Sequence, residues 1–319
     1  MQENRLQVWV DLLKMVLVVL VGYFLSNTLA FVVVLPLVNF DLEAIAQLVS
    51  DPLNFPETRI VLMILQGVTA LGIFVITPLI YIYWIDKTLS VKELFQKNGN
   101  YLIPLLLASV AIAIVEMPAI TWIGKWNMEI DFPEFMDSFE QWAKLQEDKL
   151  KELTLFLTEF RSFEQFLLGF VVIGILPGIG EELLFRGVLQ NKLKQLLGNV
   201  HIAIWLAAMI FSAFHLQFYG FVPRMFLGAL FGYLYQWSGN LLYAMIAHFV
   251  NNGFTVIMMY LYQQNHIELD IDKQEVSSDA AILSLILTAL LILVFYSIAS
   301  KANPLLEKLT HSESLKDKY

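Results

Sequence analysis

The sequence predicts an all-α polytopic membrane protein, a helical bundle with about eight transmembrane helices. Hydrophobic residues make up 58% of the 319 residues and charged residues only 15%, whereas roughly a quarter of a soluble domain is charged. The mean hydropathy is +0.65. The apolar residues also gather in stretches of about 20 residues, the length that a helix needs to cross a bilayer. The chain is therefore organised by membrane spans rather than by soluble domains.

Charge and cysteine content exclude several classes of function. The formal net charge is -9 and the 20 basic residues are dispersed, which argues against a nucleic-acid partner because phosphate binding needs clustered Lys and Arg. The sequence contains no Cys, so disulfides, thiol catalysis and Cys-ligated zinc are excluded. The partner that the composition implies is the lipid bilayer.

Eight apolar segments account for the predicted spans. Five are strongly apolar, at residues 15–38, 60–84, 101–123, 163 to beyond Pro177, and 281–298. Three more, at residues 200–218, 221–237 and 241–262, carry Gly, His and Asn, which a lipid-facing helix avoids. We divide the chain into residues 1–162 with spans one to three and an extramembrane segment 126–162, residues 163–262 with spans four to seven as a catalytic core, and residues 263–319 with the last span and a basic tail.

Basic residues in short loops predict the orientation of the chain. They follow the second span, the fourth span and the last span: Lys87, Lys92, Lys97, Lys192, Lys194, Lys301, Lys308, Lys316 and Lys318. The connection after the first span is acidic, with Asp41, Glu43 and Asp51. We therefore expect an integral, multi-pass protein of a bacterial cytoplasmic membrane with both termini in the cytoplasm.

The extramembrane segment is predicted to contain an amphipathic helix. From Phe139 onward, Trp142, Leu145, Leu150 and Phe156 recur near a 3.6-residue period. A surface helix at the membrane interface is favoured over a helix that gates substrate entry.

Ionisable residues inside spans are costly unless they are paired or line a wet cavity, so each is a candidate functional residue. Residues 176–180, Leu-Pro-Gly-Ile-Gly, are predicted to interrupt the fourth span. A new helix would then begin beside Glu181 and Glu182. The positive end of its dipole would favour the ionised form of both carboxylates. Arg186 follows Glu182 by four residues, so these two are predicted to pair and Glu181 is left to face a cavity. The alternative is a purely structural network in which both carboxylates satisfy Arg186 and nearby backbone.

Two histidines also lie within predicted spans. His215 ends the fifth span and His248 lies in the seventh, where Asn252 shares its helical face. At 1.5 Å per residue, Glu181 and His215 fall about 25 Å from the turn that follows the fourth span, and His248 falls roughly 20 to 26 Å from it, as does Asn252. A lone intramembrane histidine is as readily a packing residue. The convergence of three helices at one level instead predicts a site.

The residue types suit hydrolysis of a peptide bond. Glu181 and His215 would hold and deprotonate a water molecule, while His248 and Asn252 would stabilise the oxyanion. The ligand types of Glu181, His215 and His248 could instead bind a divalent metal such as zinc, although no His-Glu-x-x-His motif supports this. The metal-free and metal-dependent versions both stay open, with the metal-free one slightly favoured, and no other cofactor is predicted.

Together the motifs resemble the three-motif signature of the CPBP family of intramembrane proteases, which includes the type II CAAX prenyl endopeptidases and the Abi, or bacteriocin-immunity, proteins. They are Gly-Glu-Glu-Leu-Leu-Phe-Arg-Gly at 180–187, Phe-x-x-x-His at 211–215 and His-x-x-x-Asn at 248–252. The resemblance covers roughly residues 163–262, and residues 1–160 match no motif known to us.

The resemblance implies an eight-helix, glutamate-dependent membrane endopeptidase. It leaves both a metal-free enzyme and a metalloprotease open. Its catalytic residues would be Glu181, Glu182, Arg186, His215, His248 and Asn252. The expected substrate is a membrane-embedded or lipidated peptide or protein. Two other classes remain as alternatives: a non-catalytic binding or bacteriocin-immunity protein that uses the same pocket, and a transporter, suggested by the broken fourth helix.

Overall fold

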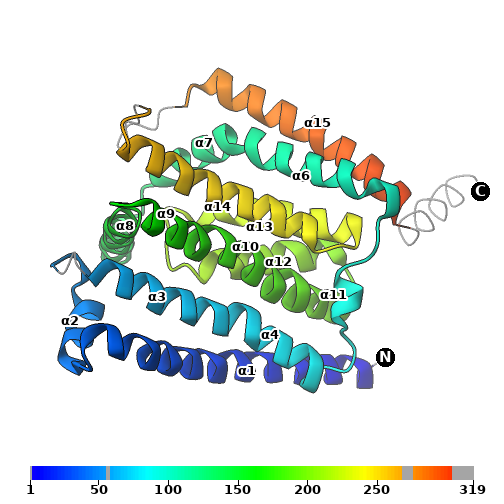
Figure 1. Cartoon of the computed structure of the whole chain (residues 1–319). Helices are drawn as coiled ribbons and strands as arrows, with labels where there is room; N and C mark the ends of the chain where they lie inside the picture. The colour runs from blue at the N-terminus through cyan, green and yellow to red at the C-terminus, as the bar shows by residue number, and fades with distance from the viewer. Residues whose placement is uncertain (1, 55–57, 268–275, 304–319) are drawn as a thin grey trace, which may run out of the picture.

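The computed structural model describes residues 2–54, 58–267 and 276–303. Within these ranges the named elements are helices, and the β-type pairing is an isolated antiparallel bridge between Phe95 and Asn240. The predicted all-α fold is confirmed for this part of the chain. The helices lie side by side in a bundle, with the start of α1 and the end of α15 at the same end (Figure 1).

The helices, with η marking 3-10 or π-helical stretches, are α1 (Gln2–Val34), η1 (Leu35–Val38), α2 (Leu42–Ser50), η2 (Pro52–Asn54), α3 (Arg59–Ala70), η4 (Leu71–Ile76), α4 (Thr77–Ile80), η5 (Tyr81–Ile85), α5 (Val91–Leu94), η6 (Gly99–Tyr101), α6 (Leu102–Val115), α7 (Met117–Met128), η7 (Glu134–Met136), α8 (Asp137–Leu157), α9 (Phe163–Gly169), η8 (Phe170–Ile175), α10 (Leu176–Glu182), η9 (Leu183–Gln190), α11 (Asn191–Leu197), α12 (Val200–Ala213), α13 (Phe221–Ser238), α14 (Leu242–Gln263) and α15 (Ser278–Ala302).

Six helical segments among the described residues are long and apolar enough to cross a membrane. They are Arg5–Val38, Arg59–Ile85, Gly99–Met128, Phe163–Leu197, Leu242–Gln263 and Ser278–Ala302. The other two predicted spans correspond to α12, an apolar helix of 14 residues, and to α13, of 18 residues. α12 ends before residue 218 because the chain turns there, with Leu216 at a positive φ of 54°. The count of eight spans is not confirmed.

The outer helices expose large apolar side chains that water would not tolerate in such number. Leu13 and Phe24 of α1 are 67% and 68% exposed, and Leu293 of α15 is 63% exposed. Contiguous apolar surface of this kind is stable against lipid chains. These helices therefore form the lipid-facing sides of the bundle. The polar side chains of the candidate site lie in the interior of the bundle.

The fourth span is continuous, so the prediction that residues 176–180 interrupt it is wrong. Helical structure runs from Phe163 to Leu197. Pro177 lies directly after the π-helical stretch η8, and a widened turn of this kind accommodates the proline ring and its missing N–H. Glu181 and Glu182 consequently lie inside a helix, and no free helix N-terminus stabilises their charge. The transporter alternative loses the feature that suggested it.

Glycines in the fourth span serve close packing instead of a break. A Cβ on Gly178 would lie 2.9 Å from the backbone nitrogen of Phe249, and one on Gly174 would lie 3.4 Å from Cα of Gly253. Only glycine permits α10 and α14 to approach this closely. The position of Glu181 relative to the polar residues of α14 is therefore set by contact between two backbones.

The turns that bound the central helices lie where the spacing argument requires them. Gly198, with φ of 67°, ends α11, and the Oδ1 of Asn199 accepts hydrogen bonds from the backbone N–H groups of His201 and Ile202 to cap α12. Gly239, with φ of 66°, ends α13. The first turn joins the fourth span to α12 and the second joins α13 to α14, so these helices carry their polar residues to one cavity.

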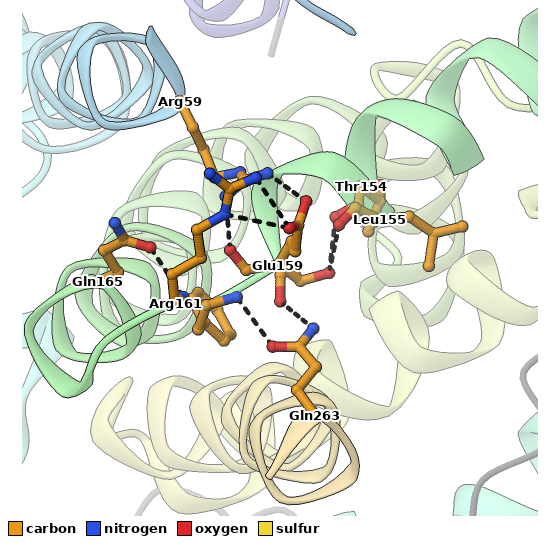
Figure 2. Close-up of polar contacts among 9 residues, drawn as sticks. Arg59, Thr154, Leu155, Glu159, Arg161, Gln165 and Gln263 are labelled. Atoms are coloured by element: carbon orange, nitrogen blue, oxygen red, sulfur yellow. Dashed lines mark hydrogen bonds and ion pairs between the residues drawn. The ribbon is translucent and has the colours of Figure 1, made fainter. Parts of the chain in front are cut away.

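The helix α8, of 21 residues, confirms the predicted amphipathic helix in the extramembrane segment. It is seen nearly end-on in Figure 1 and so runs across the bundle, at the end opposite the start of α1. Its C-terminal end is fixed by an ion pair between Arg59 and Glu159 and by the amide of Gln263, which donates to the carbonyl of Thr158 at 2.6 Å (Figure 2). The orientation suits a membrane interface, and the interfacial location itself stays a prediction.

A buried basic residue ties the first helix to the fourth span at the opposite end. Lys192, which is 0% exposed, forms an ion pair with Asp86, a second with Asp11 of α1 at 3.5 Å, and a hydrogen bond to Thr88 at 2.9 Å. The start of α1, the end of α15 and α11 share this end of the bundle (Figure 1). The cytoplasmic orientation of that end stays a prediction, and Lys308, Lys316 and Lys318 of the predicted tail lie outside the described residues.

Candidate active site

A cavity of about 400 Å³ lies between the fourth span, the α12–α13 turn and α14. Four of the six predicted site residues line it: Glu181, His215, His248 and Asn252. Glu182 and Arg186 lie behind its wall, fully buried. Much of the remaining lining is apolar, including Phe211, Phe231 and Leu227, so the polar groups act in a weakly screening environment.

The predicted pair between Glu182 and Arg186 is present. Nη1 of Arg186 lies 2.7 Å from Oε1 of Glu182, and both side chains are at most 1% exposed. Nη2 of Arg186 donates to the carbonyl of Gly228 at 2.9 Å, and its guanidinium lies 4.4 Å from the centre of the Phe211 ring. The pair thus fixes the fourth span against α12 and α13.

His248 is held by a contact that the spacing argument does not predict. Its Nδ1 lies 2.8 Å from the same Glu182 oxygen that binds Arg186. Its ring stacks on Phe231 with centroids 5.1 Å apart and an angle of 18°. Because a carboxylate only accepts, Nδ1 carries the proton, and Nε2 is a donor only when the ring is the imidazolium. Nε2 lies 3.9 Å from Oε2 of Glu181.

Asn252 shares a helical face with His248, as predicted. Its Nδ2 lies 3.3 Å from Nε2 of His248 and donates to the carbonyl of Ile173 at 3.2 Å. The amide of Asn251 donates to Oδ1 of Asn252 at 3.2 Å and thereby orients its Nδ2 toward His248. Two nitrogens from one helix therefore lie side by side at the cavity.

His215 lies in the turn after α12 and not within the helix. Its Nδ1 donates to the carbonyl of Phe211 at 3.0 Å, so in the neutral ring Nε2 is an acceptor. The Phe211 ring packs against it edge-on, with centroids 5.1 Å apart. His215 and Glu181 share no hydrogen bond, although both line the same cavity. The space between them is where the predicted water molecule would lie.

Arg224 of α13 lines the cavity as well, and sequence reasoning missed it. Its Nη2 donates to Oε1 of Gln217 at 2.8 Å, and the amide of Gln217 donates to Oε1 of Glu147 in α8 at 3.2 Å. The signal was present, because an arginine within the predicted sixth span is an intramembrane charge of the kind that marks a site.

Glu147 gives the network a dependence on pH. Burial raises the pKa of the Glu147 carboxyl above its ordinary value of 4.5, more than the charge of Arg224 and the hydrogen bond from Gln217 lower it. A group whose pKa is raised by folding contributes stability that is present below the unfolded pKa and is lost as pH rises through the folded pKa. We therefore expect Glu147→Gln to raise the unfolding temperature relative to wild type at about pH 8, with a gap that shrinks toward about pH 5.

Thermal unfolding of the detergent-purified protein measures this gap at both pH values. Glu152→Gln is the matched control, because it makes the same change on an exposed residue of the same helix. A gap that is independent of pH, or that widens on acidification, would contradict the assignment of the pH dependence to Glu147.

The ligand types predicted for a metal do not come together as a metal site. Among the residues that the structure describes, no group of three or more His, Asp or Glu side chains has a suitable arrangement. The Nδ1 of His248 is taken by Glu182, and that of His215 by a backbone carbonyl. We therefore derive no chemical step through a metal ion, and metal dependence stays a prediction for experiment.

The fold and the cavity define a helical membrane protein with a buried site of carboxylates, histidines and an amide. Residues 163–254 match the model of the family described as Type II CAAX prenyl endopeptidase Rce1-like, and this segment contains all six predicted site residues. This segment of the chain is thus similar to that family, and the resemblance predicted from the motifs is confirmed over these residues.

One curated relative and the solved structures complete the comparison. The uncharacterized protein YpbD of Bacillus subtilis (strain 168) is 36% identical over 84 residues, which are 25% of this chain and 40% of YpbD. The chain therefore spans about two fifths of the length of that relative. No solved structure matches the chain.

Proposed function

We propose that the protein is an intramembrane endopeptidase that hydrolyses a peptide bond in a membrane-embedded or lipid-tethered protein or peptide. One observation carries the proposal: four polar side chains from three separate parts of the chain, Glu181, His215, His248 and Asn252, line one cavity inside an apolar bundle. Buried polar groups of this cost are retained in membranes where they do chemistry or bind a ligand. The family match over residues 163–254 favours the chemistry of a protease.

In the proposed reaction, the Glu181 carboxylate and Nε2 of His215 hold a water molecule between them. Glu181 accepts a proton from the water as its oxygen attacks the carbonyl carbon of the scissile bond. When the tetrahedral intermediate collapses, the C–N bond breaks and Glu181 returns that proton to the leaving amine. The products are a carboxylic acid and an amine, and one water is consumed.

His248 and Asn252 are proposed to stabilise the negative charge that develops on the carbonyl oxygen. Nε2 of His248 and Nδ2 of Asn252 lie 3.3 Å apart, close enough to donate to one oxygen. In this role His248 is the imidazolium, because Nδ1 faces the carboxylate of Glu182 while Nε2 donates to the substrate oxygen. With Glu181 and Glu182 ionised and Arg186 and His248 cationic, the four groups sum to zero charge. Glu182 and Arg186 are thus positioning residues rather than groups that touch the substrate.

We propose the metal-free version of the reaction, in which no metal holds the water. Chelation is therefore expected to leave the cleavage rate within about twofold of the rate without chelator. EDTA and phenanthroline treatment of the purified protein, with peptide cleavage as the readout, checks this. Rate loss that zinc restores, accompanied by a zinc-dependent rise in unfolding temperature, would establish the metal-dependent version with Glu181, His215 and His248 as ligand candidates.

The proposed function is tested by comparing the protein termini of membranes from cells with wild-type protein and cells with Glu181→Gln. New termini that are lost only in the variant would identify both activity and substrate. The rival is a non-catalytic binding or bacteriocin-immunity protein with the same pocket. Glu181→Gln keeps the shape of the pocket, so a biological function that persists in this variant, with unchanged termini, would favour the rival.

A further inference from the structure

Arg224 is a charged residue in the cavity for which the proposed reaction has no use. Among the described residues that line the cavity, it is the one Lys or Arg side chain. Its Nη1 is buried and has no hydrogen-bond partner among the described residues. Leaving a buried guanidinium donor unpaired is costly unless a ligand satisfies it. The unpaired Nη1 of Arg224 therefore indicates that an anionic group of the substrate binds there.

The surroundings of Arg224 hold its guanidinium in place. Gln217 accepts from Nη2 at 2.8 Å and is itself fixed by donation to Glu147 of α8 at 3.2 Å. Gly220 makes room for the group, because a Cβ there would lie 2.8 Å from Nη2. These contacts fix the Nη2 side of the fork and leave Nη1 unbonded. A guanidinium held on one side is prepared to bind a carboxylate on the other.

The carboxylate of Glu181 is not the ion-pair partner of Arg224. Glu181 and Arg224 are within electrostatic reach of each other but form no ion pair. Glu147 attracts Arg224 electrostatically, but it accepts its hydrogen bond from Gln217, and it does not line the cavity. The remaining lining near Arg224, with Pro223, Leu227 and Ile120, is apolar. An incoming anion would therefore find the unpaired Nη1 of Arg224 beside apolar lining.

We infer that Arg224 is the specificity residue of the cavity and binds a carboxylate of the substrate peptide, either its C-terminal carboxylate or the side chain of an Asp or Glu near the scissile bond. The inference rests on the proposed function, which makes the cavity a peptide site. A carboxylate is favoured because the planar fork of arginine matches it.

Binding and cleavage are measured with three forms of one synthetic apolar hexapeptide: the free C-terminal acid, the C-terminal amide, and the amide with one internal Glu. Affinity is measured on full-length Glu181→Gln protein in detergent, and cleavage on the corresponding Glu181 protein. We expect an anionic form to bind about 10- to 100-fold more tightly than the neutral amide. Preference for the free acid identifies a terminal carboxylate, and preference for the internal Glu identifies a side chain.

Three variants test whether Arg224 causes the preference for anionic peptides. Arg224→Gln is expected to remove the difference between anionic and neutral peptides by lowering the affinity for the anionic forms. Arg224→Lys keeps the charge without the fork and is expected to retain part of the preference. Arg161→Gln removes an arginine whose ion pair with Glu159 is exposed, and is expected to change neither.

The outcomes separate this inference from the proposed function. Equal affinity for all three peptides, no binding of any, or an equal loss for all three in Arg224→Gln would overturn the carboxylate site. Arg224-dependent preference without cleavage by the Glu181 protein would support the site and contradict the endopeptidase. Cleavage without charge preference would support the endopeptidase and contradict the site.

Discussion

Replacing Glu181 by Gln is expected to lower the rate of peptide hydrolysis by about 10²- to 10⁴-fold, the range that general-base catalysis supplies. Gln has the size of Glu and still accepts a hydrogen bond, but it cannot take a proton from water. The effect on stability should be small, since Glu181 makes no close ion pair and its nearest charged partner atom, Nε2 of His248, is 3.9 Å away. Cleavage rate and unfolding temperature are measured on the same purified sample.

Glu164→Gln is the matched control, because it makes the same change on an exposed residue near the start of the same span. This control should keep the wild-type rate. A Glu181→Gln protein that cleaves as fast as the control would remove Glu181 from the mechanism. A loss of rate that follows a loss of folded protein would also fail to support a role as base.

Replacing Arg186 by Met is expected to destabilise the protein by about 3–5 kcal/mol, the cost of leaving a buried charge without its partner. Glu182 is 0% exposed and would keep only His248 as a charged neighbour within reach. The carbonyl of Gly228 would also lose its donor from Arg186. Denaturant or thermal unfolding in detergent measures the loss.

Two further variants show whether the charge is the cause. Adding Glu182→Gln to Arg186→Met should recover part of the stability, because the uncompensated carboxylate is then gone. Arg161→Met breaks an exposed pair with Glu159 and should cost less than about 1 kcal/mol. If Arg186→Met were as stable as Arg161→Met, the buried pair would not hold the site together.

Sequence reasoning was most successful where composition or a fixed helical spacing decides the result. The six candidate spans follow from the length and apolar content of their helical segments. The pairing of Glu182 with Arg186 follows from a separation of four residues within one helix, and it is present at 2.7 Å. Both inferences use only local geometry.

The errors arose where tertiary packing overrides a local rule. Pro177 and its neighbouring glycines break an isolated helix, but here a π-helical turn accommodates the proline and Gly178 serves contact with Phe249. The contact between Glu182 and His248 joins residues 66 apart in the sequence, so no spacing rule could reveal it. Arg224 differs, because its charge within a predicted span was visible in the sequence, while its hydrogen bond to Gln217 of the turn after α12 was not.

The backbone contact between α10 and α14 divides the cavity into two unlike halves. Glu181 lies on one of these helices and His248 and Asn252 on the other, so their separation cannot widen without parting two packed backbones. The facing half, with His215 and Arg224, is held by side-chain hydrogen bonds, such as the one from Ser212 to the carbonyl of Phe221 at 2.7 Å. We expect a bulky peptide to be admitted by displacement of that turn, while the distance between base and oxyanion donors stays constant from one substrate to the next.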